Sequence, residues 1–125
     1  MQSNVVGWFE LYVNDMGRAK AFYEAVFQLE LKELPAVGGE MQMLAFPMVD
    51  NAYGAPGALV KSPHTQPGSG GTLIYFSSQD CAEHGARVQA HGGIVLQPKM
   101  PIGPFGFIVI AQDMEGNSFG LHSMK

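Results

Sequence analysis

The feature that most constrains the fold is an order of predicted elements that occurs twice, once on each side of a central loop. The segment 63–71, PHTQPGSGG, has two prolines, three glycines and no apolar periodicity, so it favours neither helix nor strand. Each half reads as one strand, one helix and three strands. We therefore predict a single domain, 1–125, built from two βαβββ modules at about 5–62 and 71–124, joined by the loop 63–70.

The first half begins with a strand, WFELYV, whose side chains alternate in direction. One face carries Phe9, Leu11 and Val13, and the other carries Trp8, Glu10 and Tyr12. Asn14 and Asp15 then supply an N-cap, and apolar residues at helical spacing predict an amphipathic helix through MGRAKAFYEAVF. Three strands follow, in LELKELP, EMQMLAFP and GALVKS.

The second half repeats this order after the loop. TLIYFSS predicts a strand, and the residues from Ser78 to Asp80 offer a cap. Cys81, Gly85 and Val88 fall at helical spacing before Gly92 and Gly93 end the helix. IVLQPKM, FGFIVIAQ and NSFGLHSM predict three more strands, the last two joined by a turn over 113–117.

Composition narrows the class of protein. Only 14% of the 125 residues are charged and the net charge is -4, so no basic field is available for nucleic acid. No apolar run approaches the roughly 20 residues that span a bilayer, so we expect no membrane partner. The single cysteine, Cys81, cannot form an internal disulfide, which fits a reducing compartment and favours a cytoplasmic location.

Three segments, 9–27, 84–99 and 106–122, resemble the vicinal oxygen chelate superfamily of glyoxalases, bleomycin-resistance proteins and extradiol dioxygenases. The resemblance implies an α+β fold in which the two modules form a curled mixed sheet around an open cleft, with the helices outside. It also implies a small-molecule ligand in the cleft and a homodimer. Two positions depart from the family pattern: Gln28 stands where glycine is frequent, and Met114 where proline is usual.

The resemblance also indicates where metal-dependent relatives place their ligands. Matched residue by residue, these positions fall on Trp8, Thr72, Gly120 and a residue within 57–59. None of them offers a good metal donor. We therefore expect no metal and no cofactor, and neither glyoxalase-type isomerisation nor ring-cleaving dioxygenation.

Glu10 and His122 are the candidate catalytic residues. Glu10 shares a strand face with aromatic residues, and an apolar setting would raise the pKa of its carboxyl group toward that of a general base. The implied fold makes Glu10 and His122 possible neighbours, as an acid–base pair or as a shifted metal site. The structural alternative is that Glu10 pairs with a cation or hydroxyl across the sheet and only specifies register.

Aromatic and polar residues near the implied cleft are candidates for ligand binding, although core packing explains most of the rings equally well. These candidates are Trp8, Tyr12, Thr72, Phe76 and Phe107. His64, His84 and His91 are expected mainly at the surface, with His64 as a conceivable third metal ligand. Cys81 is expected in the core.

Three functions fit these features. The first is a metal-independent binding or sequestering protein for a partly apolar molecule, with Trp8 and Tyr12 as stacking surfaces. The second is a lyase or isomerase that uses Glu10 and His122. The third is a regulatory domain whose cleft is filled by side chains and whose surface binds a partner.

Overall fold

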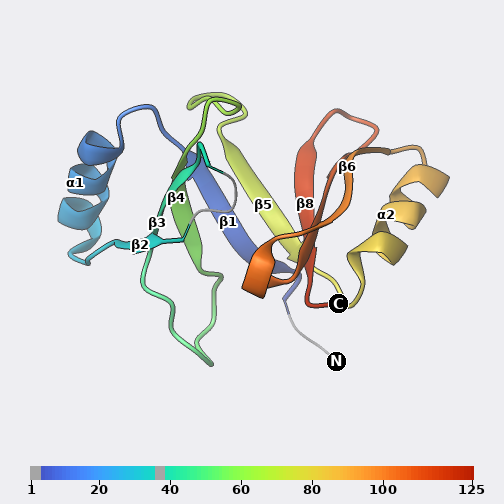
Figure 1. The fold of residues 1–125 in the computed structure, drawn as a ribbon, viewed down its shortest axis with the longest axis horizontal. Helices are drawn as coiled ribbons and strands as arrows, with labels where there is room; N and C mark the ends of the chain where they lie inside the picture. The colour runs from blue at the N-terminus through green and yellow to red at the C-terminus, as the bar shows by residue number, and fades with distance from the viewer. Residues whose placement is uncertain (1–3, 36–38) are drawn as a thin grey trace. The chain divides into compact units, whose positions relative to one another are not determined.

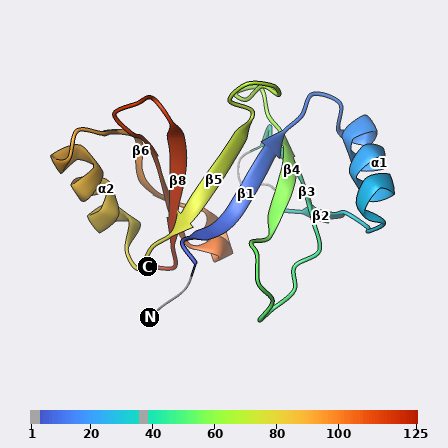
Figure 2. The same ribbon diagram turned by 180° about the vertical axis from the view of Figure 1, so that it is seen from behind.

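The computed structural model describes residues 4–35 and 39–125, which form two compact units. The N-terminal unit is Trp8–Leu73, and the C-terminal unit is Ile74–Lys125 together with residues 4–7. Each unit has one helix and a mixed sheet in the order βαβββ (Figure 1; Figure 2 shows the reverse side). The predicted α+β class with two βαβββ modules is therefore confirmed.

The N-terminal unit pairs its first and last strands in parallel. Its elements are β1 (Val6–Tyr12), α1 (Met16–Phe27), β2 (Lys32–Leu34), β3 (Gln42–Ala45) and β4 (Gly57–Lys61). The strand order is β2-β3-β4-β1, with β1 parallel to β4 and the other pairs antiparallel. The parallel pair is possible because α1 provides the long crossover connection that parallel strands require.

The C-terminal unit has the same topology. Its elements are β5 (Thr72–Ser77, which begins in the other unit), α2 (Cys81–Ala90), β6 (Ile94–Pro101), a 3-10 turn (Gly103–Phe105), β7 (Phe107–Gln112) and β8 (Ser118–Ser123). The strand order is β5-β8-β7-β6, with β5 parallel to β8. The predicted turn over 113–117 is present, and the Asp113 carboxylate accepts hydrogen bonds from Glu115 and Asn117.

Both helices begin where the sequence predicts. The Asp15 carboxylate accepts a hydrogen bond from the backbone N–H of Arg18, and Asp80 accepts one from Ala82. These bonds satisfy amide groups that have no partner inside the helix. α1 ends at Gln28, whose φ of 52° lies in the left-handed region. That conformation explains why glycine suits this position, because glycine has no Cβ to resist it.

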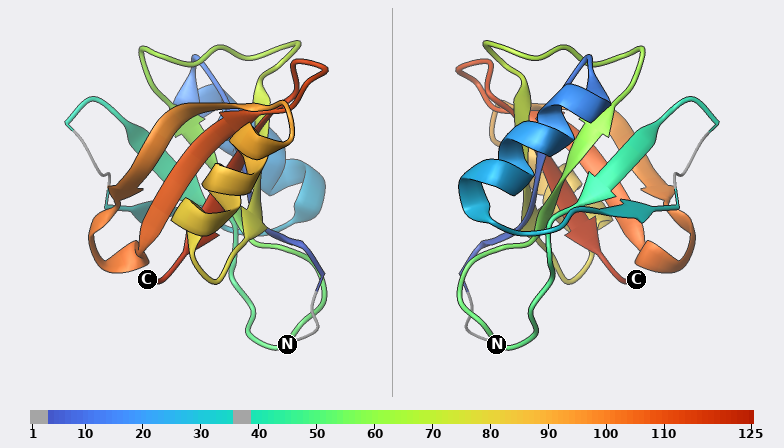
Figure 3. Two further views of the ribbon diagram at one scale, coloured as in Figure 1. Left: turned by 90° about the vertical axis from the view of Figure 1, so that its right-hand side faces the viewer. Right: turned by 90° about the vertical axis from the view of Figure 1, so that its left-hand side faces the viewer.

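Each helix packs on one face of its own sheet (Figure 3). In the N-terminal unit, Met16 contacts a core formed by Leu31, Leu44 and Leu59, with Leu11 and Val13 packed against it. In the C-terminal unit the core consists of Cys81, Val109, Ala111 and Leu121. Cys81 is fully buried, so its expected place in the core is confirmed.

The apolar stripe of α1 is only partly covered. Met16 is buried and Tyr23 is half-buried, whereas Phe22, Val26 and Phe27 are each more than half exposed. Residues at spacings of three and four mark one broad face of a helix, and the sheet beneath α1 covers only part of it. Periodicity therefore predicted the helix correctly but did not show how much of its apolar face is buried.

Candidate functional site

Glu10 lies on the face of β1 that points away from α1, between two donors on its own strand. The Trp8 indole donates a hydrogen bond from Nε1 to Oε2 of Glu10 at 3.2 Å. The Tyr12 hydroxyl donates to Oε1 at 2.9 Å. The two donors are two residues before and after Glu10, because alternate side chains of a strand share a face. Glu10 thus has a hydroxyl partner, but along its strand rather than across the sheet.

Burial raises the pKa of the Glu10 carboxyl group above its ordinary value of 4.5, while the hydrogen bonds from Tyr12 and Trp8 oppose that rise. An ionised carboxylate has about four acceptor positions, and these two donors use two of them. The group can therefore accept a further hydrogen bond from a ligand, or take up a proton more readily than an exposed glutamate would.

His122 lies on β8, on the sheet face away from α2, as Gly120 and Ser118 do. Its ring is fixed by a hydrogen bond of 2.5 Å between Nε2 and the backbone carbonyl of Phe105. A carbonyl oxygen only accepts, so Nε2 must carry the proton. Nδ1 is then the nitrogen left to act as a base or a ligand in the neutral ring.

The positions that hold metal ligands in metal-dependent relatives do not fit a metal here. The Trp8 indole is a donor, already bonded to Glu10. A side chain at Gly120 would collide with the ring of Tyr75, and one at Gly57 would collide with the ring of Phe9. Within residues 4–35 and 39–125, no group of three or more His, Cys, Asp or Glu side chains could hold a metal ion.

The remaining predicted ligand-binding residues lie in surroundings of their own. Phe76 and Phe107 pack against the core on the α2 side of their sheet. Phe107 also lies beneath the ammonium group of Lys99, whose nitrogen is 4.8 Å from the ring centroid. Thr72 is exposed at the start of β5. Within the N-terminal unit, Trp8 and Tyr12 both donate to Glu10.

The three other histidines lie in different settings. His64 is exposed in the loop after β4, where its backbone N–H donates to the Ser62 hydroxyl. His91 is exposed at the end of α2. His84 is half-buried on α2, and its Nδ1 lies 2.6 Å from the hydroxyl oxygen of Ser78.

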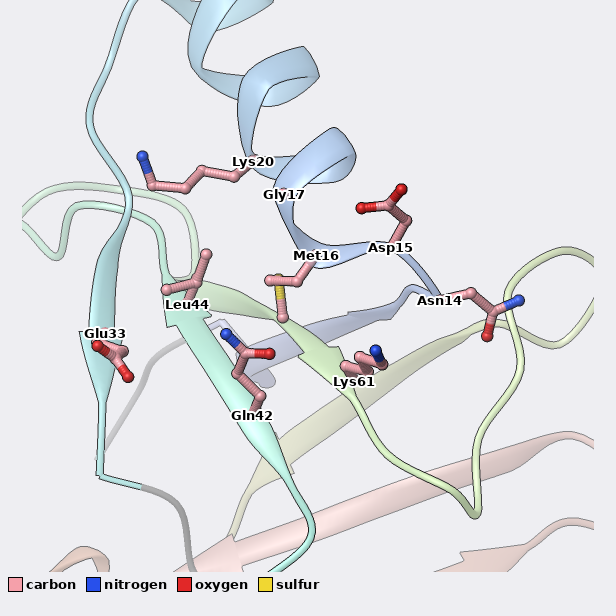
Figure 4. A pocket seen from close by; sticks show the side chains of 9 residues that line it. All are labelled: Asn14, Asp15, Met16, Gly17, Lys20, Glu33, Gln42, Leu44 and Lys61. Atoms are coloured by element: carbon pink, nitrogen blue, oxygen red, sulfur yellow. The ribbon is translucent and has the colours of Figure 1, made fainter.

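A hollow of about 610 Å³ lies at the start of α1, in the N-terminal unit, and Figure 4 shows its lining. Met16 and Leu44 form its apolar part, and Gln42 and Lys61 reach it from paired positions on β3 and β4. The charged residues on its wall are Lys20, Lys61, Asp15 and Glu33. Opposite charges are balanced there, so the hollow favours neither an anion nor a cation, and sequence reasoning singled out none of its residues as functional.

Comparison with known families gives a match over almost the whole chain. Residues 5–121 match the family model described as Glyoxalase/Bleomycin resistance protein/Dioxygenase superfamily. The chain belongs to this superfamily. The resemblance seen in the three sequence segments is therefore confirmed, and this glyoxalase-like chain is expected to share the superfamily's fold. No curated protein matches it.

Solved structures similar to this glyoxalase-like chain are distant in sequence. A hypothetical protein from Bacillus halodurans has a TM-score of 0.74 at 12% identity, covering 99% of this chain and 96% of its own. Methylmalonyl-CoA epimerase from Mycobacterium tuberculosis has a TM-score of 0.72 at 12% identity, covering 100% of this chain and 93% of the epimerase chain. A Streptomyces coelicolor methylmalonyl-CoA epimerase variant in complex with 2-nitronate-propionyl-CoA has a TM-score of 0.69 at 16% identity. The match covers 96% of this chain and 94% of the epimerase chain. These likenesses support the fold.

None of the described helices combines the length and the apolar character needed to cross a membrane.

Proposed function

We propose that this chain binds a small, partly apolar molecule on the β1 face that carries Glu10, without the metal used by many members of the superfamily. The observation that carries the proposal is the Trp8–Glu10–Tyr12 arrangement. Two aromatic side chains flank a carboxylate that retains acceptor capacity, so the face combines apolar contact with one polar anchor. The matching ligand has an aromatic or aliphatic body and a hydroxyl, amide or amine donor.

The chain has a single tryptophan, so its fluorescence reports on this face. Benzyl alcohol, benzylamine and benzyl methyl ether serve as probes with a neutral donor, a cationic donor and no donor. We expect saturable changes in Trp8 fluorescence with the first two, and at least about tenfold weaker binding of the ether, since it gives Glu10 nothing to accept. Equal responses to all three, or no saturable response, would contradict the proposal.

A second candidate function is a lyase or isomerase that uses Glu10 as the base. The raised pKa of Glu10 favours it, because proton transfer near neutral pH requires a base with a pKa higher than that of an ordinary glutamate. His122 would be its partner. The two functions differ in the Glu10→Gln variant: a base is lost entirely, so turnover falls by several powers of ten, whereas a binding anchor is only weakened.

Measuring the metal content shows whether Glu10 and His122 hold a metal ion, which neither of the two functions requires. Inductively coupled plasma mass spectrometry on untagged protein is compared with the variants Glu10→Ala and His122→Ala. Near-stoichiometric metal that both variants lose would replace the metal-free proposal with metal-assisted chemistry. Metal-free protein that still binds the benzyl probes supports the proposal as stated.

Two expectations remain predictions beside this function. They are the pairing of two copies of the chain and its location in the cytoplasm.

A further inference from the structure

A second hollow, of about 440 Å³, lies beside α2 in the C-terminal unit. α2 contributes His84, Arg87 and Val88, spaced so that they share one face of the helix. The rest of the lining comes from residues before β1, on β5 and on β8: Val5, Phe76, Ser77, Phe119 and Leu121. Its volume falls in the range of about 300–1,000 Å³ typical of small-molecule pockets. It involves none of the residues in the proposed function.

The lining of this hollow is mainly apolar. The rings of Phe76 and Phe119 meet edge to face, with centroids 5.5 Å apart. Both rings are only half-buried, so part of their surface is available to a ligand. Val88 is half-buried beside them, and Leu121 is buried in the underlying core. An alkyl or aryl group placed here would remove apolar surface from water, at about 25 cal/mol per Å².

The cationic and imidazole groups of the hollow come from α2, and Ser77 on β5 adds a hydroxyl. Arg87 is exposed, and no carboxylate of the described residues forms an ion pair with it. The ring of His84 is held by the Ser78 hydroxyl at Nδ1, which leaves Nε2 without a partner among the described residues. None of the described residues that line the hollow is acidic. The charge here is therefore positive, unlike the balanced hollow at the start of α1.

We propose that this hollow binds small monocarboxylates with an apolar tail. The carboxylate lies on the Arg87 guanidinium, whose planar donors match both carboxylate oxygens, and His84 supplies a further donor. The tail lies on Phe76 and Phe119. This site is on the helix side of the C-terminal unit's sheet and makes the chain a binder of two chemically different ligands.

The test uses hexanoate as the probe, titrated into the full chain and followed residue by residue by two-dimensional NMR. We expect saturable shifts in 76–77, 84–88 and 119–121. Hexanamide has the same tail without the charge, and hexylammonium reverses the charge. Both should bind at least about tenfold more weakly than hexanoate.

Arg87→Gln keeps most of the side chain and removes the charge, so it should weaken hexanoate binding about tenfold or more. Arg87→Lys should recover part of that loss, since it restores the charge but not the planar fork. Arg18→Gln, on the exposed start of α1, is the matched control and should leave binding within about twofold. The NMR spectrum of each free variant shows whether it is folded.

The proposal would be overturned by no saturable shift with hexanoate, by equal binding of hexanoate and hexanamide, or by an unchanged affinity in folded Arg87→Gln. Shifts centred on Trp8 and Tyr12 instead would also overturn it, and would assign the carboxylate to the β1 face. The benzyl probes test that face separately, so failure of one site is distinguishable from failure of the other.

Discussion

Glu10 and Tyr75 occupy equivalent places in the two units, each five residues before the aspartate that caps the helix, but they have different neighbours. Glu10 lies opposite Ala58 on the parallel strand β4, and Tyr75 lies opposite Gly120 on the parallel strand β8. The Glu10 carboxylate accepts hydrogen bonds from Trp8 and Tyr12 on its own strand, whereas the ring of Tyr75 lies against Gly120. One backbone arrangement therefore supports two different surfaces.

The residue on the neighbouring strand follows the same contrast. It is Ala58 on β4 and Gly120 on β8, where the ring of Tyr75 leaves no room for a Cβ. In the N-terminal unit the sheet face away from the helix retains a carboxyl group with acceptor capacity. In the C-terminal unit the equivalent position holds Tyr75, which has no carboxylate. This difference is the reason the proposed function is assigned to the β1 face.

The largest expected effect comes from Gly120→Val, which places a branched side chain on β8 at the position where β4 has Ala58. The new side chain would collide with the ring of Tyr75, and overpacking of this kind should lower the free energy of unfolding by about 3 kcal/mol. Urea unfolding measures the loss. In the double variant with Tyr75→Ala the collision is absent. The loss of unfolding free energy should therefore be smaller than the sum of the losses in the two single variants. Strict additivity would show that the ring does not lie on Gly120.

Glu10→Gln should change how stability depends on pH. Because the pKa of Glu10 is raised on folding, the folded chain holds its proton above pH 4.5, and stability falls as pH rises through the folded pKa. The slope for one proton is at most about 1.4 kcal/mol per pH unit. Glutamine does not titrate, so the variant should lack this fall. Unfolding by urea at several pH values measures both chains.

Three other carboxylates should make stability rise with pH, at lower pH values, and they serve as an internal reference. The hydrogen bonds from Leu31 and Lys20 lower the pKa of Glu24, the hydrogen bond from Lys99 lowers that of Asp80, and those from Asn117 lower that of Asp113. Their stabilisation is lost as pH falls through the lowered pKa values. It should persist in Glu10→Gln. A variant that retained the fall above pH 4.5 would assign it to a different group.

Gly85→Ala should stabilise the C-terminal unit by up to about 1 kcal/mol. Gly85 is buried in the middle of α2, yet an added Cβ would meet Val109 and Val95 at ordinary distances of 3.6–3.8 Å. Alanine therefore gains helix propensity without a clash. Thermal unfolding should show a higher midpoint. A lower midpoint would mean that α2 lies closer to β7 than described.

Gln28→Gly should give the smallest effect, a stabilisation of about 0.5 kcal/mol in the N-terminal unit. Glycine relieves the left-handed backbone at the end of α1, and its greater freedom in the unfolded chain offsets part of that gain. Gln28→Asn is the comparison, since asparagine tolerates this conformation better than glutamine. Destabilisation by glycine would contradict the left-handed assignment.

Sequence reasoning predicted the elements well because their boundaries have chemical signals. Asp15 and Asp80 cap the two helices, and Gly92 with Gly93 ends the second. The contacts between strands were less predictable, because they depend on register. The close approach of the Tyr75 ring to Gly120 follows only from the pairing of β5 with β8, which no local pattern reveals.

The grouping of Trp8, Glu10 and Tyr12 on one strand face was predictable, but the hydrogen bonds between them were not. Alternation placed Trp8, Glu10 and Tyr12 on one face, but the partners of Glu10 depend on how far each side chain reaches along the strand. The hollow beside α2 could not be anticipated, since Arg87 and Phe119 lie far apart in sequence. The roles of Glu10 and His122 remain predictions.

Cys81 gives the C-terminal unit a reporter of its own motions. It is the only cysteine of the chain, and it is fully buried at the start of α2, where its backbone N–H donates to the Ser123 hydroxyl. A thiol reagent can reach the sulfur only when α2 separates from its sheet. The labelling rate in native buffer therefore measures how often this helix opens, and ligands that occupy the hollow beside α2 should slow it.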